Sequence, residues 1–554
     1  MMQAIPANRH TGLIEYAESL EANYINEILI NILRKSNDID LLDLSKNVRD
    51  YLKAHGQFFT PKNTSKFMIK QFNLENKNDT IYLLDPGAGI GIFESSLCEH
   101  LIEQNLHDIN IKLDLYENDE NILPLLKDNI SHCRDLMSQN DCVIQFNICE
   151  RDFLLSNSAF FEEASNCLQN RYDFIICNPP YYKLKNDSPY KLKMTNIIRA
   201  QPNIYSLFMA LCAKLLKEDG QIVLLTPRSY CSGTYFKLLR RQFFMEIVPT
   251  KIHLFHSRKK VFNNVIQEVM ILTGVKSSKI PEQITVSSSN GELMDGNYEF
   301  RNVDYSKIVI KKGNEVFIRV PVSELDDEIA AKIDGLSFDL SKLGLGVSTG
   351  KVVPDRCDYL IRNLDNRDSY APLLWMKNIT NGSVRWPVDM GTKSIAVSVK
   401  QSSLKLLLLN NNYVLVKRFS SKEGKRRLNA GALFRDTIDS YYIAIENHVN
   451  YIYRSDGELT KYEVNGITAL LNSRIYNIYF QIMNGSTQVN ASELLELPLP
   501  SIEKIRSIGK FAEENRIDNF IEIEKYIGKE LDVDGNLLET ILMRYQKPLH
   551  HFKT

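Results

Sequence analysis

Residues 83–93 read LLDPGAGIGIF, an apolar run followed by Asp-Pro and three spaced glycines ahead of a predicted helix. Glycine permits a tight strand-to-helix turn and lets a ligand approach the backbone closely. A G-x-G pattern alone also suits a dinucleotide. The next predicted strand ends in Glu117, whose carboxylate can accept hydrogen bonds from both hydroxyls of a ribose. The segment therefore predicts a nucleotide-binding turn at the end of a strand.

Short β-rich runs alternate with helical stretches from about residue 80 to 275. Strands are predicted at 81–85, 112–117, 143–147, 173–178, 221–227, 251–255 and 268–273. A helix is predicted over 203–217, and the apolar spacing over 13–34 predicts a further helix that packs against the next domain. Alternating strands and helices are typical of an α/β fold with a parallel sheet covered on both faces. Ligands in such folds bind beyond the carboxyl ends of the strands.

The pattern of polar and apolar residues changes beyond residue 280. Polar–apolar alternation becomes shorter and turn signals more frequent, while 469–483 has helical spacing. Because the chain has 554 residues, more than one core is expected. We predict an N-terminal helical extension over 1–50, a catalytic domain over 51–280 and a separate α+β region over 285–554, with the boundary near 276–290.

Composition excludes several classes of protein. Lys+Arg 67 against Asp+Glu 68 gives a net charge of −1, so local patches must hold any anionic partner. The nine cysteines form no C-x-x-C pair, which indicates reduced thiols and neither a disulfide framework nor a metal site. The chain shows no signal peptide and no apolar run of about 18 residues. We expect a cytoplasmic protein without a membrane partner.

Residues 173–182, DFIICNPPYY, form a hydrophobic strand that runs into Asn178-Pro179-Pro180-Tyr181. Two prolines fix φ and remove two N–H donors. The Asn178 amide oxygen and the Pro179 carbonyl can then act as outward acceptors, and an aromatic ring follows at once. This combination suits a planar exocyclic amine, because two acceptors take its N–H groups while the ring stacks on the heterocycle.

NPPY after a strand, preceded by D-P-x-x-G-x-G, resembles the N6-adenine DNA methyltransferases of type II restriction-modification systems. The segment HGQFFTP at 55–61 is similar to that family's cofactor-loop motif, and the order of the motifs is that of the gamma subclass. Specific motifs cover about residues 50–275, and 484–500 is more loosely similar to C-terminal stretches of target-recognition domains. The resemblance implies a Rossmann-like, seven-stranded S-adenosylmethionine methyltransferase sheet with a C-terminal α+β target-recognition domain.

The resemblance also assigns residues to roles. Those expected to bind S-adenosylmethionine are Phe59, Thr60, Pro61, Asp85, Pro86, Gly87, Ala88, Gly89, Gly91, Glu117, Asn118, Asp152, Phe153 and Asn178. The expected catalytic residues are Asn178, Pro179, Pro180, Tyr181 and Phe262. Asn178 and the Pro179 carbonyl would hold the amine, while Tyr181 and Phe262 would enclose a flipped base. No metal is expected.

The implied substrate is double-stranded DNA, methylated at N6 of an adenine flipped out of the helix. A separately encoded restriction endonuclease is the implied partner, against which methylation protects DNA. Cationic runs follow NPPYY, flank Phe262 and occupy 417–427, where they can neutralise phosphates. The residues expected to contact DNA are Lys183, Lys185, Lys191, Lys193, Arg199, Lys259, Lys260, Arg385, Lys417, Arg418, Arg426 and Arg427.

Other interpretations stay open. Cytosine N4 has the same amine geometry as adenine N6, and NPPY also suits methyltransferases for protein glutamine or guanine N2 in RNA. A bifunctional restriction and methylation enzyme would need a nuclease core, yet only about 50 residues precede Phe58. A DNA- or nucleotide-binding protein without catalysis would have no use for the outward acceptors of NPPY.

Overall fold

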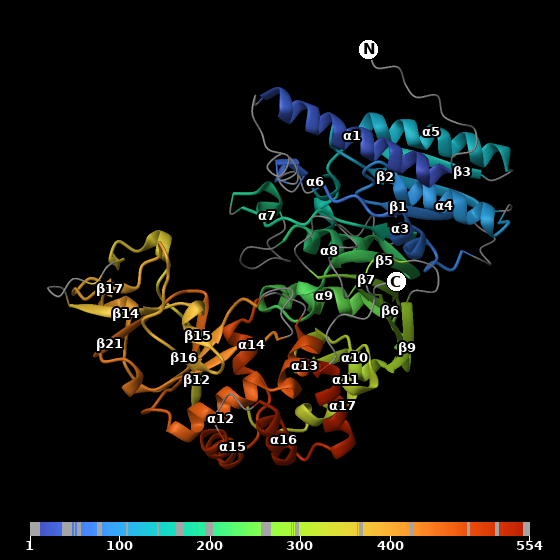
Figure 1. Ribbon diagram of the computed structural model, residues 1–554. Coiled ribbons are helices and arrows are strands. Elements are labelled where there is room, and N and C mark those ends of the chain that lie inside the picture. The colour runs from blue at the N-terminus through green and yellow to red at the C-terminus, as the bar shows by residue number, and fades with distance from the viewer. Residues whose placement is uncertain are drawn as a thin grey trace. The chain divides into compact units, whose positions relative to one another are not determined.

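The computed structural model divides into two compact units, Met1–Val322 and Ser323–Thr554, which are described separately (Figure 1). The described residues are 12–35, 47–48, 50–52, 57–74, 80–106, 109–140, 143–161, 171–185, 187–193, 203–255, 268–289, 291, 293, 298–362, 364, 369–420, 426–484, 488–515 and 520–546.

A nine-stranded sheet forms the centre of unit 1. Its strands are β1 (Ile81–Asp85), β2 (Asn110–Tyr116), β3 (Val143–Cys149), β4 (Tyr172–Cys177), β5 (Leu216–Pro227), β6 (Ile247–Phe255), β7 (Val269–Lys276), β8 (Gln283–Ser289) and β9 (Tyr298–Asp304). They lie in the order β3-β2-β1-β4-β5-β7-β6-β8-β9. All seven predicted strands are confirmed as β1 to β7. Their buried apolar side chains, such as Leu84, Ile175 and Leu224, form the core.

The sheet differs from the expected seven-stranded parallel one in two respects. β7 runs antiparallel to both β5 and β6, so the parallel prediction fails at this position. β8 then pairs parallel with β6, and β9 pairs antiparallel with β8. These two additional strands follow the expected end of the catalytic domain. They therefore extend the sheet past the predicted boundary.

Helices cover this sheet. They are α1 (Leu13–Lys35), α3 (Lys62–Ile69), α4 (Ile92–Glu103), α5 (Leu123–Gln139), α6 (Phe153–Ser156), α7 (Pro189–Lys193), α8 (Tyr205–Leu215), α9 (Lys237–Glu246) and α10 (Tyr305–Ile308). The helices predicted over 13–34 and 203–217 are confirmed as α1 and α8. α8 is apolar on every side and almost wholly buried, which places it inside the unit.

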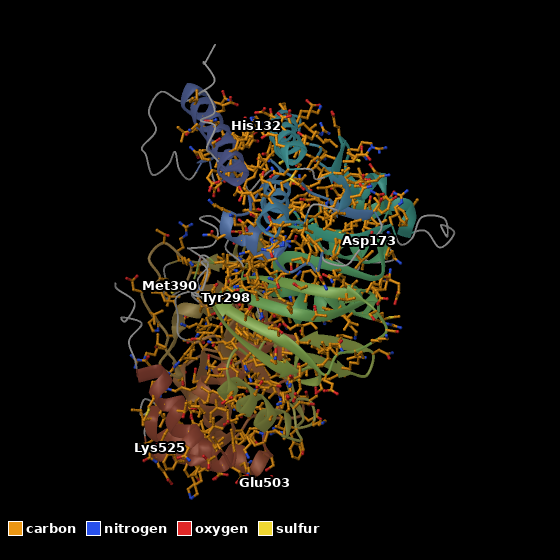
Figure 2. The ribbon with its side chains drawn as sticks, turned by 90° about the vertical axis from the view of Figure 1, so that its right-hand side faces the viewer. His132, Asp173, Tyr298, Met390, Glu503 and Lys525 are labelled. Atoms are coloured by element: carbon orange, nitrogen blue, oxygen red, sulfur yellow. The ribbon has the colours of Figure 1, made fainter. Side chains whose placement is uncertain are left out.

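The predicted N-terminal extension packs directly on the helices of unit 1. Tyr16 of α1 donates a hydrogen bond to Asp128 of α5 at 2.8 Å, and its ring lies 4.0 Å from that of His132. Figure 2 labels His132 next to α1. The backbone N–H of Ile14 donates to Glu99 of α4 at 3.0 Å. α1 is therefore part of the same compact unit.

A hairpin also moves the boundary of unit 1 beyond the predicted 276–290. β10 (Val309–Lys312) and β11 (Glu315–Ile318) pair antiparallel. The Arg240 side chain of α9 is only 1% exposed and donates to the carbonyl oxygens of Val316 at 2.5 Å and Gly233 at 2.6 Å. A buried guanidinium needs such acceptors, so the hairpin belongs to the fold of unit 1.

Unit 2 combines two sheets with helices. Its strands are β12 (Leu345–Thr349), β13 (Leu360–Ile361), β14 (Tyr370–Leu374), β15 (Ile379–Thr380), β16 (Ser383–Val384), β17 (Ala396–Ser398), β18 (Leu407–Leu409), β19 (Tyr413–Lys417), β20 (Ala430–Leu433), β21 (Tyr442–Ile445) and β22 (Val449–Arg454). Its helices are α11 (Glu324–Asp334), α12 (Lys461–Asn472), α13 (Arg474–Met483), α14 (Ala491–Leu495), α15 (Ile502–Glu514), α16 (Phe520–Glu530) and α17 (Gly535–Gln546). The sheet orders are β12-β22-β19-β20-β16-β15 and β13-β17-β14-β21-β18.

The helical run predicted at 469–483 consists of two helices. α12 ends at Asn472, and Ser473 begins α13 by accepting a hydrogen bond from the Tyr476 N–H at 3.1 Å. A serine at this position satisfies an otherwise free N–H at the helix start.

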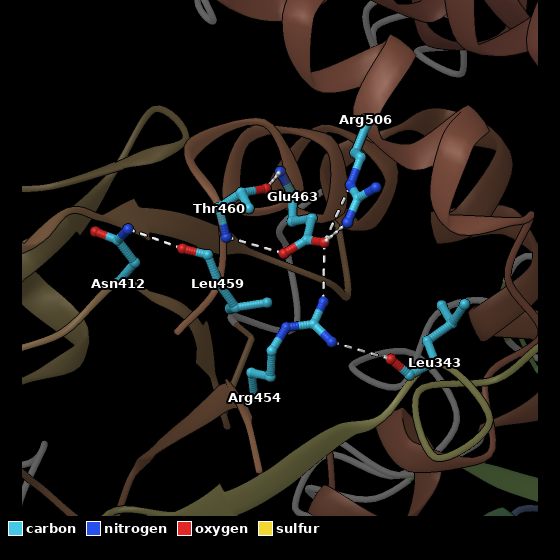
Figure 3. Close-up of polar contacts among 7 residues, drawn as sticks. All are labelled: Leu343, Asn412, Arg454, Leu459, Thr460, Glu463 and Arg506. Atoms are coloured by element: carbon cyan, nitrogen blue, oxygen red, sulfur yellow. Dashed lines mark hydrogen bonds and ion pairs between the residues drawn. The ribbon is translucent and has the colours of Figure 1, made fainter. Parts of the chain in front are cut away.

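A buried carboxylate joins three segments of unit 2 (Figure 3). Glu463, whose side chain is 0% exposed, forms a capping box with Thr460 at the start of α12. Its Oε1 also accepts hydrogen bonds from Arg454 of β22 and Arg506 of α15, each at 2.9 Å. This network ties sheet and helices together because a buried carboxylate is stable only with such partners.

In the described part of both units, no helix has the length and apolarity required to cross a bilayer.

Candidate active site

A cavity of about 180 Å³ lies in unit 1 at the carboxyl ends of β1, β2 and β4. Ten of the residues predicted from the sequence line it: Phe59, Pro86, Gly87, Gly89, Glu117, Asn118, Asp152, Phe153, Asn178 and Pro180. They come from five segments separated by up to about 120 positions along the chain. The expectation that ligands bind beyond the carboxyl ends of strands thus identifies the cavity.

The glycine loop between β1 and α4 forms one wall. Gly89 has φ +58°, and a Cβ built there would lie 4.0 Å from the Phe59 ring. Gly87 N–H donates to Asp85 Oδ1 at 3.0 Å, which holds the turn closed. Asp85 Oδ2 is buried without a hydrogen-bond partner among the described residues. Burial and the charge of Glu117 raise the pKa of Asp85 to about 7, against the effect of the Gly87 N–H.

Glu117 follows β2 and is held by backbone donors. Its Oε1 accepts from the N–H groups of Asn118 and Asp119, each at 2.8 Å, and its Oε2 accepts from Gly89 N–H at 3.0 Å. Burial raises the pKa of this carboxyl, while the three N–H groups oppose the rise. The carboxylate is therefore oriented before any ligand binds, and its remaining lone pairs can accept the hydroxyls of a ribose.

Asp152 and Phe153 form the opposite end of the cavity. Asp152 caps α6 by accepting from the Leu155 N–H at 2.7 Å, and its second oxygen accepts from the Tyr190 hydroxyl at 2.7 Å. The Phe153 ring lies 5.1 Å from that of Tyr116 and 5.3 Å from that of Phe208. An aromatic wall beside a fixed carboxylate suits a flat heterocycle that carries an amine.

Asn178 stands where β4 ends, and its amide is oriented by the 57–61 segment. The Nδ2 group donates to the Phe58 carbonyl oxygen at 2.8 Å and to Thr60 Oγ1 at 2.9 Å. Both amide hydrogens are therefore engaged, which leaves Oδ1 as the group that can accept. The predicted cofactor loop and the NPPY motif, 118 to 120 positions apart, thus form one structure.

Tyr181 is buried rather than open to the cavity. Its ring is 9% exposed and stacks on Phe58 with the centroids 5.5 Å apart. The hydroxyl lies 2.5 Å from Asn178 Oδ1 and 2.7 Å from the Leu225 carbonyl oxygen. The aromatic residues that do line the cavity from this segment are Tyr182 and Tyr190.

Other predicted cofactor residues have structural positions behind the cavity wall. Thr60 is 4% exposed and holds Asn178, while Pro61 precedes the first turn of α3. Ala88 is buried and its N–H donates to the Tyr116 carbonyl oxygen at 3.0 Å. Gly91 has φ +85°, and a Cβ there would lie 2.8 Å from Asn129 Nδ2 of α5. Glycine, which has no Cβ, is thus required at this position for α5 to pack against the loop.

The residues assigned from the sequence leave out several lining residues, of which Gln57 and Phe58 lie within the quoted HGQFFTP motif. Among them are Gln57, Phe58, Asp119, Tyr182, Tyr190 and Phe208. Gln57 and Asp119 each lie within two residues of a predicted site residue, so proximity to the motifs was the available signal. Tyr190 and Phe208 follow the NPPY motif by more than eight positions, and only the folding of α7 and α8 brings them to the cavity.

The predicted DNA contacts have varied environments. Lys183, Lys185 and Arg385 are exposed, and Lys191, Lys417 and Arg418 are half-buried. Arg426 lies over the Phe520 ring at 4.5 Å, and the Arg427 backbone N–H donates to Asn477, so both also take part in packing of unit 2. Arg199, Lys259, Lys260 and Phe262 lie outside the described residues, as does the side chain of Lys193.

A larger cavity of about 360 Å³ lies elsewhere in unit 1, between α3 and strands β6 to β9. Its buried His253 has Nδ1 2.8 Å from Ser287 Oγ and Nε2 3.1 Å from Ser289 Oγ. The glycine loop, Glu117 and Asn178 are all absent from its lining. The larger of these two cavities is therefore not the one that the predicted site residues line.

Comparison with known proteins adds three findings. Residues 44–262 match the Eco57I restriction-modification methylase family. The type II methyltransferases M.BsuBI of Bacillus subtilis and M.PstI of Providencia stuartii are each 31% identical to the chain; the alignments cover 88% and 84% of this chain and 94% and 92% of the relatives. The type IIL restriction-modification enzyme MmeI, solved in complex with DNA, has a similar fold, with a TM-score of 0.53 and 13% identity over 97% of this chain and 78% of that one.

Proposed function

The chain belongs to the type II methyltransferases of restriction-modification systems, and on this basis we propose that it methylates N6 of an adenine in double-stranded DNA. S-adenosylmethionine is the proposed methyl donor. The observation that supports the proposal most directly is Asn178, whose amide is fixed at the cavity with both Nδ2 hydrogens engaged. Its Oδ1 and the neighbouring Pro179 carbonyl are the acceptors assigned to the adenine amine.

The cavity fits S-adenosylmethionine on its own chemistry. Glu117 is assigned to the ribose hydroxyls, because its carboxylate is oriented by three backbone donors. Asp152 and Phe153 are assigned to the adenine ring of the cofactor, and the loop at Gly87 and Gly89 to the methionine end. When bound, this cofactor supplies a methyl group already activated by its sulfonium sulfur. The protein therefore has to position the amine rather than generate a strong base.

Asn178 and Pro179 would perform that positioning. The adenine N6 lone pair is delocalised into the ring, so the amine is a poor nucleophile while it stays planar. Hydrogen bonds from its two N–H groups to Asn178 Oδ1 and the Pro179 carbonyl would draw the nitrogen toward tetrahedral geometry. Because N6 is inaccessible within the base stack, the adenine must be flipped into the site. Phe262 is the ring proposed to enclose it, whereas the expected role of Tyr181 in stacking on the base is not proposed, because its ring is buried outside the cavity lining.

DNA recognition is proposed to involve both units. Lys183 and Lys185 are exposed five and seven positions after Asn178, where they can contact phosphates near the flipped base. Unit 2 is proposed as the target-recognition part, with Arg385, Lys417 and Arg418 as candidate contacts. Methylation at one short recurring site would protect it from a cognate endonuclease encoded separately.

The test is methylation of plasmid DNA by purified protein with S-adenosylmethionine, followed by nucleoside mass spectrometry and single-molecule sequencing. N6-methyladenine at one recurring site is the expected result. N4-methylcytosine would overturn the base assignment. Failure to modify DNA, with S-adenosylmethionine still bound, would overturn the substrate assignment. Asn178→Ala is the control and should abolish turnover while S-adenosylmethionine binding changes little.

A further inference from the structure

One buried side chain of the N-terminal helix α1 contacts residues that line the cofactor cavity. Tyr24 is 5% exposed, and its hydroxyl donates to Gln57 Oε1 at 3.1 Å. Its ring also meets the Phe59 ring edge to face at 6.1 Å. Gln57 and Phe59 both line the cavity, whereas Tyr24 itself does not. Tyr24 therefore supports two lining residues from behind.

Gln57 in turn spans two walls of the cavity. Its Nε2 donates to Asp119 Oδ2 at 2.6 Å, and Asp119 lines the cavity beside Glu117. Asp119 is held by its own turn, since Oδ1 accepts from the Asn121 N–H at 2.8 Å. The amide of Gln57 thus connects the 57–61 segment to the loop that follows β2. Its orientation affects both the Asn178 side and the Glu117 side of the cavity.

The partners of Gln57 select one orientation of its amide. Asp119 offers acceptor oxygens, which require Nε2 on that side. The Tyr24 hydroxyl then supplies the donor that Oε1 requires on the other side. Burial raises the pKa of Tyr24 to about 12, with Gln57 opposing and Asp119 and Tyr51 adding to the rise. The phenol therefore keeps its proton at neutral pH and remains a donor.

α1 is docked firmly enough to transmit this constraint. Glu15 forms an ion pair with Lys62 of α3, and the Ile14 N–H donates to Glu99 of α4. Tyr16, two turns before Tyr24, donates to Asp128 of α5. These contacts hold α1 on three helices of the same unit. They place the Tyr24 hydroxyl at a defined position relative to the cavity.

We propose that Tyr24 is a positioning residue of the cofactor site, which acts by fixing the Gln57 amide between α1 and Asp119. The inference rests on the proposed function for the identity of the cofactor, S-adenosylmethionine. α1 is thereby part of the binding machinery rather than a covering helix. Tyr24 does not line the cavity, and its effect passes through Gln57.

The test compares Tyr24→Phe with Tyr16→Phe by calorimetric titration of S-adenosylmethionine and S-adenosylhomocysteine in the absence of DNA. Both variants remove one tyrosine hydroxyl from α1 and leave the ring in place, but only Tyr24 bonds a lining residue. Tyr24→Phe should raise Kd about three- to tenfold, the range that one net hydrogen bond carries. Tyr16→Phe should leave Kd within about twofold, because Ile14 and Glu15 still hold α1 on α4 and α3. In steady-state turnover, the KM of Tyr24→Phe for S-adenosylmethionine should rise by a similar factor.

A double-mutant cycle with Gln57→Leu distinguishes positioning from packing. If Tyr24 acts through Gln57, adding Tyr24→Phe to Gln57→Leu should not weaken binding further. An unchanged Kd for folded Tyr24→Phe would overturn the inference. So would a further three- to tenfold rise in Kd when Tyr24→Phe is added to Gln57→Leu. Either result would leave the proposed function intact. If Tyr24→Phe does not fold, normal binding by Gln57→Leu would overturn it. A wild-type protein that binds neither ligand would overturn the cofactor assignment together with the inference.

Discussion

The Tyr181 hydroxyl lies 2.5 Å from Asn178 Oδ1 and 2.7 Å from the Leu225 carbonyl oxygen. A phenol has one proton to donate, so these two acceptors compete for it. Asn178 Oδ1 is also the acceptor proposed for the adenine amine. If the amine bound there, the Leu225 carbonyl would offer the hydroxyl an alternative acceptor, so Oδ1 could be released without leaving the phenol unpaired.

Tyr181→Phe tests this competition. Because Nδ2 of Asn178 keeps both of its partners, kcat should stay within about threefold, and KM for DNA should not rise. The Leu225 carbonyl would lose a partner, which should cost about 1–3 kcal/mol of stability. Steady-state kinetics and thermal unfolding measure the two effects. A tenfold fall in kcat for a folded variant would show instead that the hydroxyl is required to hold Asn178.

Thr60→Val should impair catalysis by releasing one amide hydrogen of Asn178. Thr60 Oγ1 accepts from Asn178 Nδ2 at 2.9 Å, and valine has a similar shape without the acceptor. Losing one such bond should lower kcat about tenfold, with a small change in S-adenosylmethionine affinity. Thr60→Ser keeps the oxygen and should restore kcat. Equal rates for the valine and serine variants would contradict the role.

Asp85→Asn should flatten the dependence of stability on pH. The folded pKa of Asp85 is raised to about 7 by burial, so the folded protein binds more protons than the unfolded chain between about pH 4 and 7. Stability from this group is therefore lost as pH rises through that window. The variant should melt a few degrees higher than the wild type near pH 8, and Asp135→Asn, at an exposed position, should leave the profile unchanged. An identical pH profile for wild type and Asp85→Asn would exclude Asp85 as the source.

Glu463→Gln should destabilise unit 2. The variant weakens the bonds to Arg454 and Arg506, and the free energy of unfolding should fall by about 2–3 kcal/mol. This is less than for a fully buried ion pair, because both arginines reach solvent. Burial raises the pKa of Glu463, but the Thr460 N–H and the two arginines outweigh it and lower the pKa overall. Its contribution is thus present above the unfolded pKa and lost as pH falls through the folded one.

The matched control for that variant is Glu513→Gln. Glu513 pairs with Lys461 on the exposed surface of the same unit, so its loss should cost less than about 1 kcal/mol. Thermal unfolding followed between pH 3 and 7 compares the two. Similar melting temperatures for both variants would contradict a central role for Glu463.

Gly91→Ala should destabilise unit 1 more than Gly313→Ala. Both glycines have positive φ, +85° and +56°, so both alanine variants carry backbone strain of about 1–2 kcal/mol. Only at Gly91 would the new Cβ also meet neighbours, Asn129 Nδ2 at 2.8 Å and Leu126 at 3.1 Å. The additional overpacking should cost about 1–3 kcal/mol, measured by urea unfolding. An equal cost at both positions would mean that α5 yields to the methyl group.

Local pattern was sufficient to predict the strands β1 to β7, the glycine turn, Glu117 and the NPPY loop. Each of these depends on residues adjacent in the chain: apolar runs form strands, glycines permit the turn, and prolines remove N–H donors. Carboxyl ends of neighbouring parallel strands meet at one edge, which is why motifs far apart in sequence could be placed at one cavity.

Long-range packing set the remaining features, because they depend on partners that no local pattern specifies. The inward position of Tyr181, the bond from Thr60 to Asn178 and the bridge from Tyr24 through Gln57 each join residues brought together only by folding. The same holds for β8 and β9, whose place in the first sheet depends on pairing with β6 rather than on composition. Sequence thus specified the chemistry available at the site, while hydrogen bonding between distant segments specified its orientation.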